Sequence, residues 1–353
     1  MVTEKKDNNP LQRIISSYIV RIIFRRLFMV WAVMTLTFFI IRALPGNPIG
    51  IFVLRLTETT GMTDDEARQY ASALLHIDLD APLSKQYFDF LGNILRGDLG
   101  VSYTIATGEP VMNLILANLP WTLFSVGVAL IISFIIGIFL GMLAAYRRNT
   151  WSDHMITNLG AITDAIPNTL TAIFLIMMVG VVWRLAPITE MRGAISSGVQ
   201  PEFNLPFFLD VLKHYLWPGS IYVLTAVGSW TLAMRTSTLS TLDEDYVTVA
   251  RARGLSDWRI LTTYVGRNAS LPLVTALTIS LGFVVGGSVL IERIFVYRGL
   301  GYLLSTAIDL RDYPVMQGIL LVLSITVMLS TMLADLLYGW FDPRVRVGSM
   351  QED

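Results

Sequence analysis

Six long stretches of mostly apolar residues run through this chain of 353 residues, and they constrain its fold more than any other feature. A helix needs about 20 apolar residues to cross the hydrocarbon core of a bilayer, where every backbone N–H and C=O must find a partner within the protein. Only 15% of the residues are charged, against about 25% in a typical soluble domain. The sequence therefore predicts an all-α polytopic membrane protein with six transmembrane helices. We place these helices at residues 27–44, 119–146, 156–185, 216–238, 270–295 and 314–341.

The first and third stretches each carry a feature that needs a physical explanation. Asp164 and Pro167 interrupt the third stretch, and we expect a kink there, because neighbouring helices can satisfy the carbonyl that a proline leaves free. The first stretch follows a long basic leader and ends near Arg42, with no small-residue cleavage site after it. We therefore interpret it as a retained anchor rather than a signal peptide.

Glycines spaced four apart occur in two of the predicted spans. Gly137 and Gly141 lie in the second span, and Gly282 and Gly286 lie in the fifth. This spacing lets two helices approach closely. For the second span we expect the neighbour to belong to the same chain.

Lysine and arginine residues near the ends of the spans favour one orientation. With the N-terminus inside, basic residues cluster before the first span and after the second, fourth and sixth, while the outside segment 47–118 is rich in acidic residues. By the positive-inside rule, both termini of this multi-pass protein are cytoplasmic and the protein lies in the cell membrane. We divide the chain into a cytoplasmic segment 1–26, the first span 27–44, an extracytoplasmic insert 45–118, a core 119–341 that includes the cytoplasmic loop 239–269, and a cytoplasmic tail 342–353.

Both long extracytoplasmic segments carry helical patterns. In the insert, Tyr87, Leu91, Ile94 and Leu95 recur at the spacing of one helical face, which predicts a small folded helical insert. The loop 186–215 ends in an amphipathic stretch, FFLDVLKHYLW, which we expect to lie on the membrane surface.

The cytoplasmic segment DEDYVTVARARGLSDWRIL, residues 243–261, is polar and helix-favouring, with a glycine in its middle. Asp243 and Glu244 suit the start of a helix, and Gly254 suits the left-handed residue that ends one. Ser256 can cap a second short helix. The segment therefore predicts a helix, a glycine corner and a second helix.

The first helix of this segment places Tyr246, Val249, Ala250 and Arg253 on one face. Acidic and basic residues alternate around it, whereas a helix lying on lipid needs a broad apolar face and a basic polar face. The small alanine side chain also allows another backbone to approach closely. The pattern therefore favours a docking surface for a partner protein over a lipid surface.

The stretch DYVTVARARGLSDWRILTTYVGRNASLPLV resembles the cytoplasmic loop of permeases of ATP-binding cassette (ABC) importers, in the oligopeptide/dipeptide branch. Four further stretches resemble that branch: IIRALPGNP, LGNILRGDLGVSY, DLRDYPVMQGILL and DLLYGWFDPRVR. The insert after the first span resembles that of the first, B-type, permease of such importers. From the core of the general ABC loop pattern only Ala250 and Gly254 match, and Arg267 stands where that pattern has proline.

The resemblance implies a type I ABC importer permease fold and a transport subunit that is not itself an enzyme. It implies four kinds of contact: a second homologous permease, two ATP-binding subunits that hold ATP and Mg²⁺, an extracytoplasmic solute-binding protein, and membrane lipid. The residues that it assigns to coupling with an ATP-binding subunit are Asp245, Tyr246, Val249, Ala250, Arg251, Ala252, Arg253, Gly254, Leu255 and Asp257. Our candidates for the translocation pathway are Asn168, Phe283, Gly286 and Ser288.

The solute class is implied by the resemblance alone. Peptides are the main expectation, and oligosaccharides, nickel and opines are alternatives within the same architecture. The chain contains no GxxxxGK[ST] motif, so it lacks a phosphate-cradling loop of its own and ATP would be bound by another subunit.

Several other functions find little support in the residues. The chain has no cysteine and only three histidines without ligand spacing, so we expect no metal site and no cofactor. A net charge of −1 gives no attraction toward nucleic acid. An intramembrane hydrolase would need a nucleophile beside a base, and GGSV at residues 286–289 does not match the G-x-S-x-G motif.

A proton-coupled secondary transporter is the main alternative of a different class. Such a protein needs ionisable groups near the middle of the membrane. Asp164 and Asp335 lie instead near the cytoplasmic ends of their predicted spans. This placement favours structural roles for both.

Overall fold

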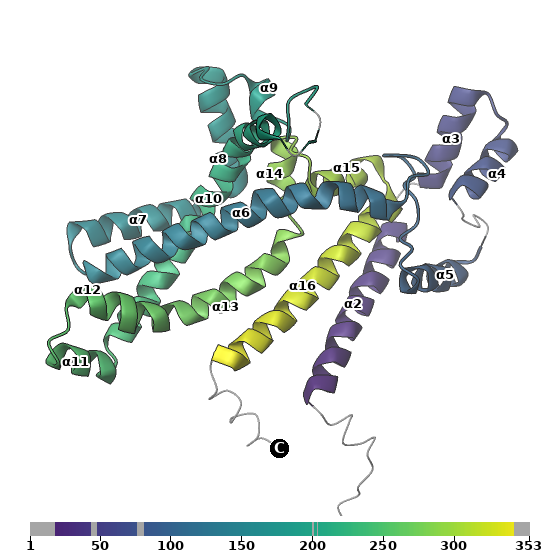
Figure 1. Cartoon of the computed structure of the whole chain (residues 1–353). Coiled ribbons are helices and arrows are strands. Elements are labelled where there is room, and N and C mark those ends of the chain that lie inside the picture. Colours follow the sequence, from purple (N-terminus) through teal and green to yellow (C-terminus); the bar gives the residue numbers. More distant parts are fainter. Residues whose placement is uncertain (1–17, 44–47, 76–80, 200, 203, 342–353) are drawn as a thin grey trace, which may run out of the picture. The chain divides into compact units, whose positions relative to one another are not determined.

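The computed structural model describes residues 18–43, 48–75, 81–199, 201–202 and 204–341, and these are helical apart from turns and connecting segments (Figure 1). The fold is all-α, as the sequence predicts, with one isolated antiparallel bridge between Val101 and Pro110 in the described part. The helices are α2 (Tyr18–Ala43), α3 (Pro48–Thr60), α4 (Asp64–Leu75), α5 (Leu83–Leu95), α6 (Val111–Tyr146), α7 (Trp151–Ala165), α8 (Asn168–Leu175), the π-helix η1 (Ile176–Val182), α9 (Ile188–Met191), α10 (Leu205–Leu242), α11 (Asp245–Ala252), α12 (Asp257–Arg259), the π-helix η2 (Ile260–Gly266), α13 (Arg267–Val284), α14 (Val289–Ile294), α15 (Leu300–Leu310) and α16 (Tyr313–Phe341).

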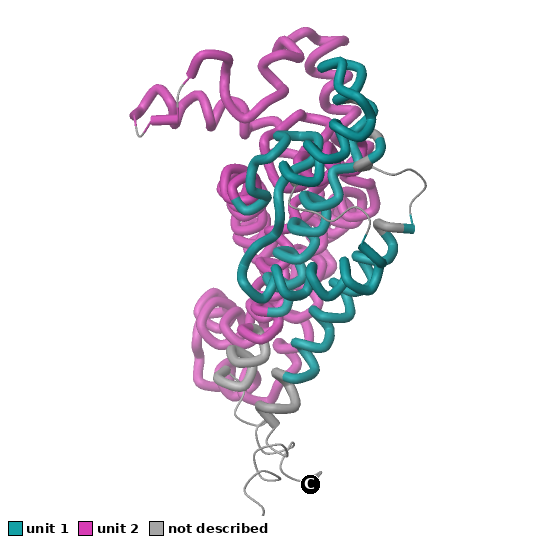
Figure 2. The backbone as a smooth tube through the Cα atoms, turned by 90° about the vertical axis from the view of Figure 1, so that its right-hand side faces the viewer, with its two compact units in different colours: residues 1–112, 310–328 teal, residues 113–309, 329–353 magenta. Residues whose placement is uncertain are grey.

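The chain divides into two compact units, which Figure 2 shows in teal and magenta. The first unit comprises residues 1–112 and 310–328, and the second comprises residues 113–309 and 329–353. The first unit therefore joins the predicted insert to the beginning of α16, although about 200 residues of sequence separate them.

In the first unit, α3 and α4 form a helical hairpin with its own small core. Phe52, Val53, Ala67 and Ala71 are buried there together with Tyr103. A capping box begins α4, because Thr63 accepts the N–H of Glu66 while the carboxylate of Glu66 accepts the N–H of Thr63 (2.9 Å). The predicted helical character of the insert is confirmed by these helices and by α5.

The amphipathic face of α5 contacts α2 through aromatic rings. Tyr87 and Phe90 lie against the fully buried Phe38, with ring centroids 5.2 and 5.1 Å apart. Leu95, which the sequence places on the same face, is 88% exposed, so the other helices do not cover this end of the face. The reason is its position as the last residue of α5, where the chain turns away at Gly97.

In the second unit, glycines bring α6 and α7 close to α10. A Cβ atom at Gly137 would clash with the Cβ of Trp230, and one at Gly141 would lie 2.5 Å from the carbonyl oxygen of Thr231. The backbones of α7 and α10 approach each other in the same way at Gly160 and Gly228. The expectation that the glycines of the second predicted span pack within this chain is confirmed.

Two helices in the described part of the chain are long and apolar enough to cross a membrane: α6 and α16 over Tyr313–Leu333. The pair Trp151–Ala165 and Asn168–Val182 meets the same criterion jointly but is bent by 94°, so the number is three if this pair forms one span. The count of six spans therefore stays a prediction.

The third predicted span does not kink as expected but breaks. α7 ends at Ala165, Ile166 is extended (φ −84°, ψ 123°), and α8 begins after Pro167. A proline disfavours the helical conformation of the residue before it and has no N–H to donate, so the helix stops here instead of bending.

The fourth and fifth predicted spans also differ from the structure. The stretch FFLDVLKHYLW is not a separate surface segment, because α10 runs without interruption from Leu205, where Asn204 caps it by accepting the N–H of Phe207 (2.9 Å). The fifth span ends at Val284, and a turn at Gly286 and Gly287 separates α13 from α14. Paired glycines weaken a helix, and Gly287 has a positive φ of 60°.

Candidate coupling site at the α11 corner

A left-handed glycine ends α11 and turns the chain into the next helix. Gly254 has a φ of 76°, its N–H donates to the carbonyl of Arg251 (2.9 Å), and the N–H of Leu255 donates to the carbonyl of Ala250 (3.3 Å). This pair of bonds is the Schellman motif. The predicted helix, glycine corner and second helix are confirmed, although Asp243 ends α10 and the hydroxyl of Ser256 makes no capping bond to α12.

One face of α11 packs on its own chain. Val247 and Ala250 are buried in a cluster with Met234 of α10, Ile260 and Val265 of η2, and Ala269 and Leu273 of α13. Ala250 is only 3% exposed, so its side chain supports α11 from within this cluster, and its predicted contact with a partner stays a prediction. The sequence could not decide this, because Ala250 belongs to two overlapping helical faces, one with Val249 and one with Val247.

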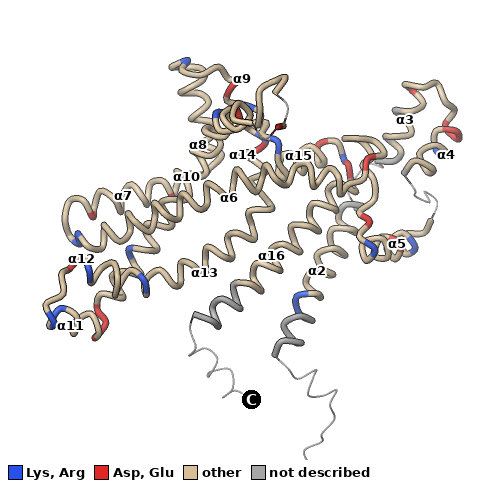
Figure 3. The backbone as a smooth tube through the Cα atoms, in the orientation of Figure 1, with Lys and Arg blue, Asp and Glu red and all other residues tan. Residues whose placement is uncertain are grey.

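The opposite face of α11 and the corner beyond it are exposed. Eight of the ten predicted coupling residues lie on this surface, and Leu255 is half-buried beneath it; the eight are Asp245, Tyr246, Val249, Arg251, Ala252, Arg253, Gly254 and Asp257. Figure 3 shows acidic and basic residues gathered at α11 and α12, whereas α6 and most of α13 carry none. We call this surface the corner surface.

Trp258 belongs to the corner surface and was missed by the sequence analysis. Its side chain is 59% exposed and that of Val249 is 57% exposed. Two large apolar side chains left open among charged ones are a common mark of a protein interface. A tryptophan four residues after the corner glycine, in an otherwise polar segment, was the available signal.

A hollow of about 380 Å³ lies beside the corner surface. Tyr246, Tyr264, Arg267, Asn268 and Leu271 line it together with Thr263. The amide of Asn268 donates to the hydroxyl of Tyr246 (2.9 Å) and to the carbonyl of Tyr264 (3.1 Å). These two bonds link α13 to α11 and η2 at the edge of the hollow.

The corner surface connects directly to long helices. From Asp257 the chain runs without a break through α12 and η2 into α13. The hydroxyl of Ser237 on α10 donates to the carbonyl of Ala269 on α13 (2.7 Å). The corner surface is therefore joined to α13 along the chain, and α13 is bonded to α10.

An ion pair that the sequence analysis missed fixes α7 to α10. The guanidinium of Arg235 donates two hydrogen bonds to the buried carboxylate of Asp153, at 2.6 and 2.9 Å. Bidentate pairs of this kind fix orientation as well as distance. Asp164, by contrast, is exposed near the end of α7, and the side chain of Asp335 lies outside the described residues.

The four pathway candidates do not share one helix. Phe283 is exposed near the end of α13, Gly286 and Ser288 lie in the turn between α13 and α14, and Asn168 is the exposed first residue of α8. The structure therefore places three of them at one break in the predicted fifth span and the fourth on a different element.

A buried carboxylate that the sequence analysis missed adjoins this break. Glu292 of α14 is fully buried and accepts the hydroxyl of Thr122 (3.1 Å) and the N–H of Tyr302 (2.9 Å). Its oxygens occupy the space that a Cβ atom would need at Gly287 and Gly299. The glycines make room for the carboxylate, and the carboxylate holds α6, α14 and α15 together.

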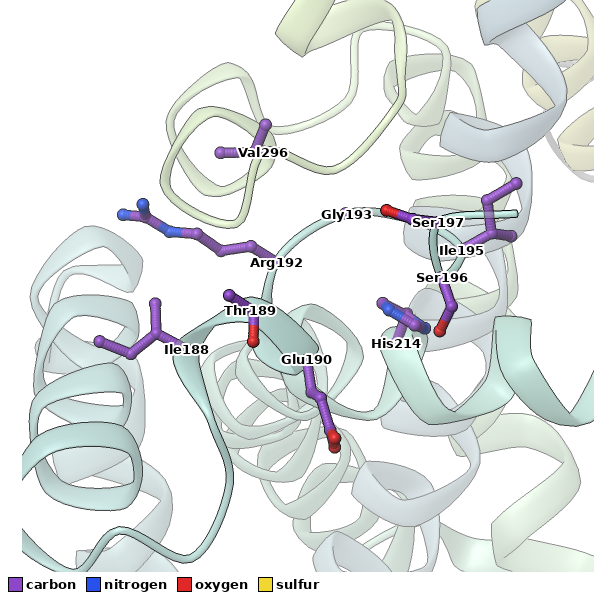
Figure 4. A pocket seen from close by; sticks show the side chains of 10 residues that line it. All are labelled: Ile188, Thr189, Glu190, Arg192, Gly193, Ile195, Ser196, Ser197, His214 and Val296. Carbon is purple, nitrogen blue, oxygen red and sulfur yellow. The ribbon is translucent and has the colours of Figure 1, made fainter. Parts of the chain in front are cut away.

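Figure 4 shows a second hollow of the second unit, of about 630 Å³, between α9, the segment after it, α10 and Val296. His214 is buried and donates from Nδ1 to the carbonyl of Asp210 (2.9 Å). Ser196 donates its hydroxyl to Asp210 (2.7 Å) and not to His214, so no nucleophile faces a base here. Burial raises the pKa of Asp210, but the hydroxyl and N–H of Ser196 and the charges of His214 and Lys213 lower it, so its pKa lies below the ordinary value.

The described residues contain no group of three or more histidine or carboxylate side chains arranged to hold a metal ion. The sequence profile of the family "binding-protein-dependent transport system inner membrane component" matches residues 137–347.

Curated relatives match nearly the whole chain. It is 32% identical to the oligopeptide transport system permease protein of Bacillus subtilis, over 94% of this chain and 99% of the relative. It is 31% identical to the dipeptide transport system permease protein of Escherichia coli, over 88% and 93%. It is also 31% identical to the di/tripeptide transport system permease protein of Pseudomonas aeruginosa, over 90% and 94%.

Proposed function

Because this chain belongs to the family of binding-protein-dependent transport system inner membrane components, we propose that it forms half of the pathway by which an ABC importer takes up short peptides. As such a component it is a multi-pass membrane permease and not the ATP-hydrolysing subunit. The names of its relatives support peptides as the solute. Oligosaccharides, nickel and opines are the alternatives in the same architecture.

The corner surface carries the proposal for coupling. An exposed face with Val249, Trp258 and alternating charges stands on a buried cluster that includes α10 and α13. A groove on an ATP-binding subunit would receive this face, and closure of two such subunits on ATP would displace the corner. The long helices would then switch between two arrangements. ATP on the cytoplasmic side and the binding protein on the outer side would each favour one of these arrangements.

The remaining partners follow from the same proposal. A second homologous permease would complete the pathway, and two separate subunits would bind ATP and Mg²⁺. The proposed topology has six spans, with both termini and residues 239–269 in the cytoplasm and residues 45–118 outside. Asn168, Phe283, Gly286 and Ser288 stay our candidates for contact with the solute.

A purification from native membranes in gentle detergent, with crosslinking before extraction, tests the architecture. We expect a second permease, two ATP-binding subunits, identical or different, and a solute-binding protein, each identified by mass spectrometry. Recovery of this chain alone or only with itself would contradict the proposal.

The solute and the corner are tested with the complete importer reconstituted in liposomes. Di- and tripeptides should be taken up in an ATP-dependent manner, whereas uptake of an oligosaccharide or of Ni²⁺ in place of peptide would support those alternatives. Val249→Glu and Trp258→Glu should remove the ATP-binding subunits from the purified complex. Leu95→Glu, at a more exposed apolar position of α5, is the control and should leave them bound.

A further inference from the structure

A single buried carboxylate in the first unit joins two segments that lie 210 residues apart in sequence. Asp312 is fully buried, and its carboxylate accepts the hydroxyl of Ser102 (2.5 Å) and the N–H groups of Tyr103 (3.1 Å), Thr104 (3.0 Å) and Ile105 (3.0 Å). Three successive N–H groups pointing at one carboxylate form an anion-binding nest. We call this arrangement the Asp312 clamp.

The clamp uses a side chain that would ordinarily serve its own helix. Asp312 directly precedes α16, and an aspartate in that place normally accepts the N–H of the second or third helical residue. The second residue is Pro314, which has no N–H. All the hydrogen bonds of this carboxylate within the described residues come from Ser102 to Ile105 instead.

The loop that the clamp holds is itself closed by hydrogen bonds. The N–H of Val111 donates to the carbonyl of Gly100 (3.0 Å), the N–H of Ser102 to that of Glu109 (2.9 Å), and the N–H of Ala106 to the hydroxyl of Ser102 (3.0 Å). Ser102 thus accepts one bond from its own loop and donates one to Asp312. The same hydroxyl therefore links the internal hydrogen bonds of the loop to the clamp.

The same loop is fixed to the helical hairpin of the insert and to the start of α6. The ring of Tyr103 is buried in the core of α3 and α4, against residues such as Phe52 and Ala67. α6 begins at Val111, the residue that closes the loop. The hairpin, the start of α6 and the start of α16 therefore meet at one carboxylate.

We propose that Asp312 is a positioning residue for coupling, which makes the insert and the first turns of α16 move as one body. The inference rests on the proposed function: a solute-binding protein that contacts the insert would then shift α16 directly. Without the clamp, the insert could move on its docked partner while α16 kept its place, and the signal would not reach the ATP-binding subunits.

The complete importer in liposomes, with its binding protein present or absent, tests this inference through the variant Asp312→Asn. An asparagine can place its one acceptor oxygen where Oδ2 of Asp312 accepts Ser102, Thr104 and Ile105, but it carries no negative charge, so the nest loses its anion. We expect the stimulation of ATP hydrolysis by the binding protein to fall about tenfold, which lies in the usual range of coupling between sites. Basal hydrolysis without the binding protein should be unchanged, because the ATP-binding subunits are intact.

Asp98→Asn is the matched control, because Asp98 is an exposed acid of the same segment whose carboxylate accepts only the N–H of Gly100 (2.8 Å) among the described residues. It should keep full stimulation. Normal stimulation in an assembled Asp312→Asn importer would overturn the inference, as would an equal fall in stimulated and basal hydrolysis. Absence of stimulation in the unaltered importer would instead contradict the proposed function itself.

A reversible crosslink keeps the test decisive if Asp312→Asn does not assemble. The chain has no cysteine, so a Ser102→Cys/Asp312→Cys pair would form without competing disulfides. The oxidised importer should respond to its binding protein, and reduction after assembly should remove that response while basal hydrolysis continues. A response that survives complete reduction would overturn the inference.

Discussion

Two helices of the second unit end in the same hydrogen-bonded turn, but the residue in the left-handed conformation is a glycine in one and a valine in the other. At the end of α11 the left-handed residue is Gly254 (φ 76°), and at the end of α14 it is Val296 (φ 49°). At α14 the N–H of Val296 donates to the backbone carbonyl of Arg293 (3.2 Å), and the N–H of Tyr297 donates to the backbone carbonyl of Glu292 (2.8 Å). This pair of bonds repeats the Schellman motif of α11. Glycine adopts this conformation freely, whereas a β-branched residue is strained in it.

The surroundings explain how each end keeps its shape. Phe295 and Tyr297 flank Val296 and are both fully buried, so the packing of α14 holds the valine in a conformation that it would not choose alone. No atom lies within 4 Å of a Cβ atom placed at Gly254. The α14 end is thus determined by its own chain, whereas the outer side of the α11 corner is open for a partner.

The largest effect on stability is expected from Glu292→Ala, which would break the α14 end. The change leaves the half-buried N–H of Tyr302 and the O–H of Thr122 without an acceptor and opens a cavity, while the Thr122 oxygen still accepts the N–H of Leu300. We expect a loss of about 3 kcal/mol. Thermal unfolding of the purified permease in lipid nanodiscs would measure it, with Glu292→Gln as the milder variant that keeps an acceptor. A loss no greater than that of an exposed glutamate variant would contradict the role of this carboxylate.

The next effect distinguishes the two faces of α11. Val247→Ala removes two buried methyl groups from the cluster beneath the corner and should cost about 2 kcal/mol of stability. Val249→Ala, two residues on, changes an exposed side chain and should leave the unfolding temperature unchanged while weakening the binding of the ATP-binding subunits. Paired unfolding and subunit-binding measurements on both variants test this. Equal effects of both changes on stability would show that α11 is oriented differently.

The identity of the left-handed residue at the α11 corner is tested by Gly254→Val. Space is not limiting, so only backbone strain opposes the change, and we expect a loss of about 1–2 kcal/mol. The corner should also shift and uncouple ATP hydrolysis from uptake. Gly254→Asn, which tolerates the same conformation, should retain most uptake, and full uptake by the valine variant would contradict the assignment of the corner.

The corner also shows how far the sequence alone could be used. Gly254, the acidic start of α11 and the bases near its end are local signals, since helix caps depend on residues a few positions apart, and they predicted the turn correctly. The buried face was not a local property. Val249 and Val247 both share a helical face with Ala250, and only the cluster on α10, η2 and α13 decides between them.

The α14 end lay beyond sequence analysis for the same reason. The apolar run 270–295 predicts one continuous helix, and nothing in its periodicity shows that Glu292 points into a space left by Gly287 and Gly299. A valine gives no sign of a left-handed turn, because the statistics of such turns favour glycine and asparagine. Contacts between residues distant in sequence therefore determine this region, as they do the Asp312 clamp.

The smallest effect, and the one that most sharpens the comparison, is expected from Val296→Gly. Glycine would release the strain of the left-handed conformation and should raise stability by about 1 kcal/mol, part of which is lost again to the greater freedom of glycine in the unfolded chain. Val296 also lines the larger hollow opposite His214. If uptake changed without a loss of stability, the strained conformation of Val296 would have a role in transport. Gly198→Ala, at an exposed left-handed glycine with no atom within 4 Å of a Cβ, supplies the opposite change and should lower stability by a similar amount. If Val296→Gly were instead destabilising, packing of the valine side chain would outweigh its backbone strain, and the two helix ends would differ less than their residues indicate.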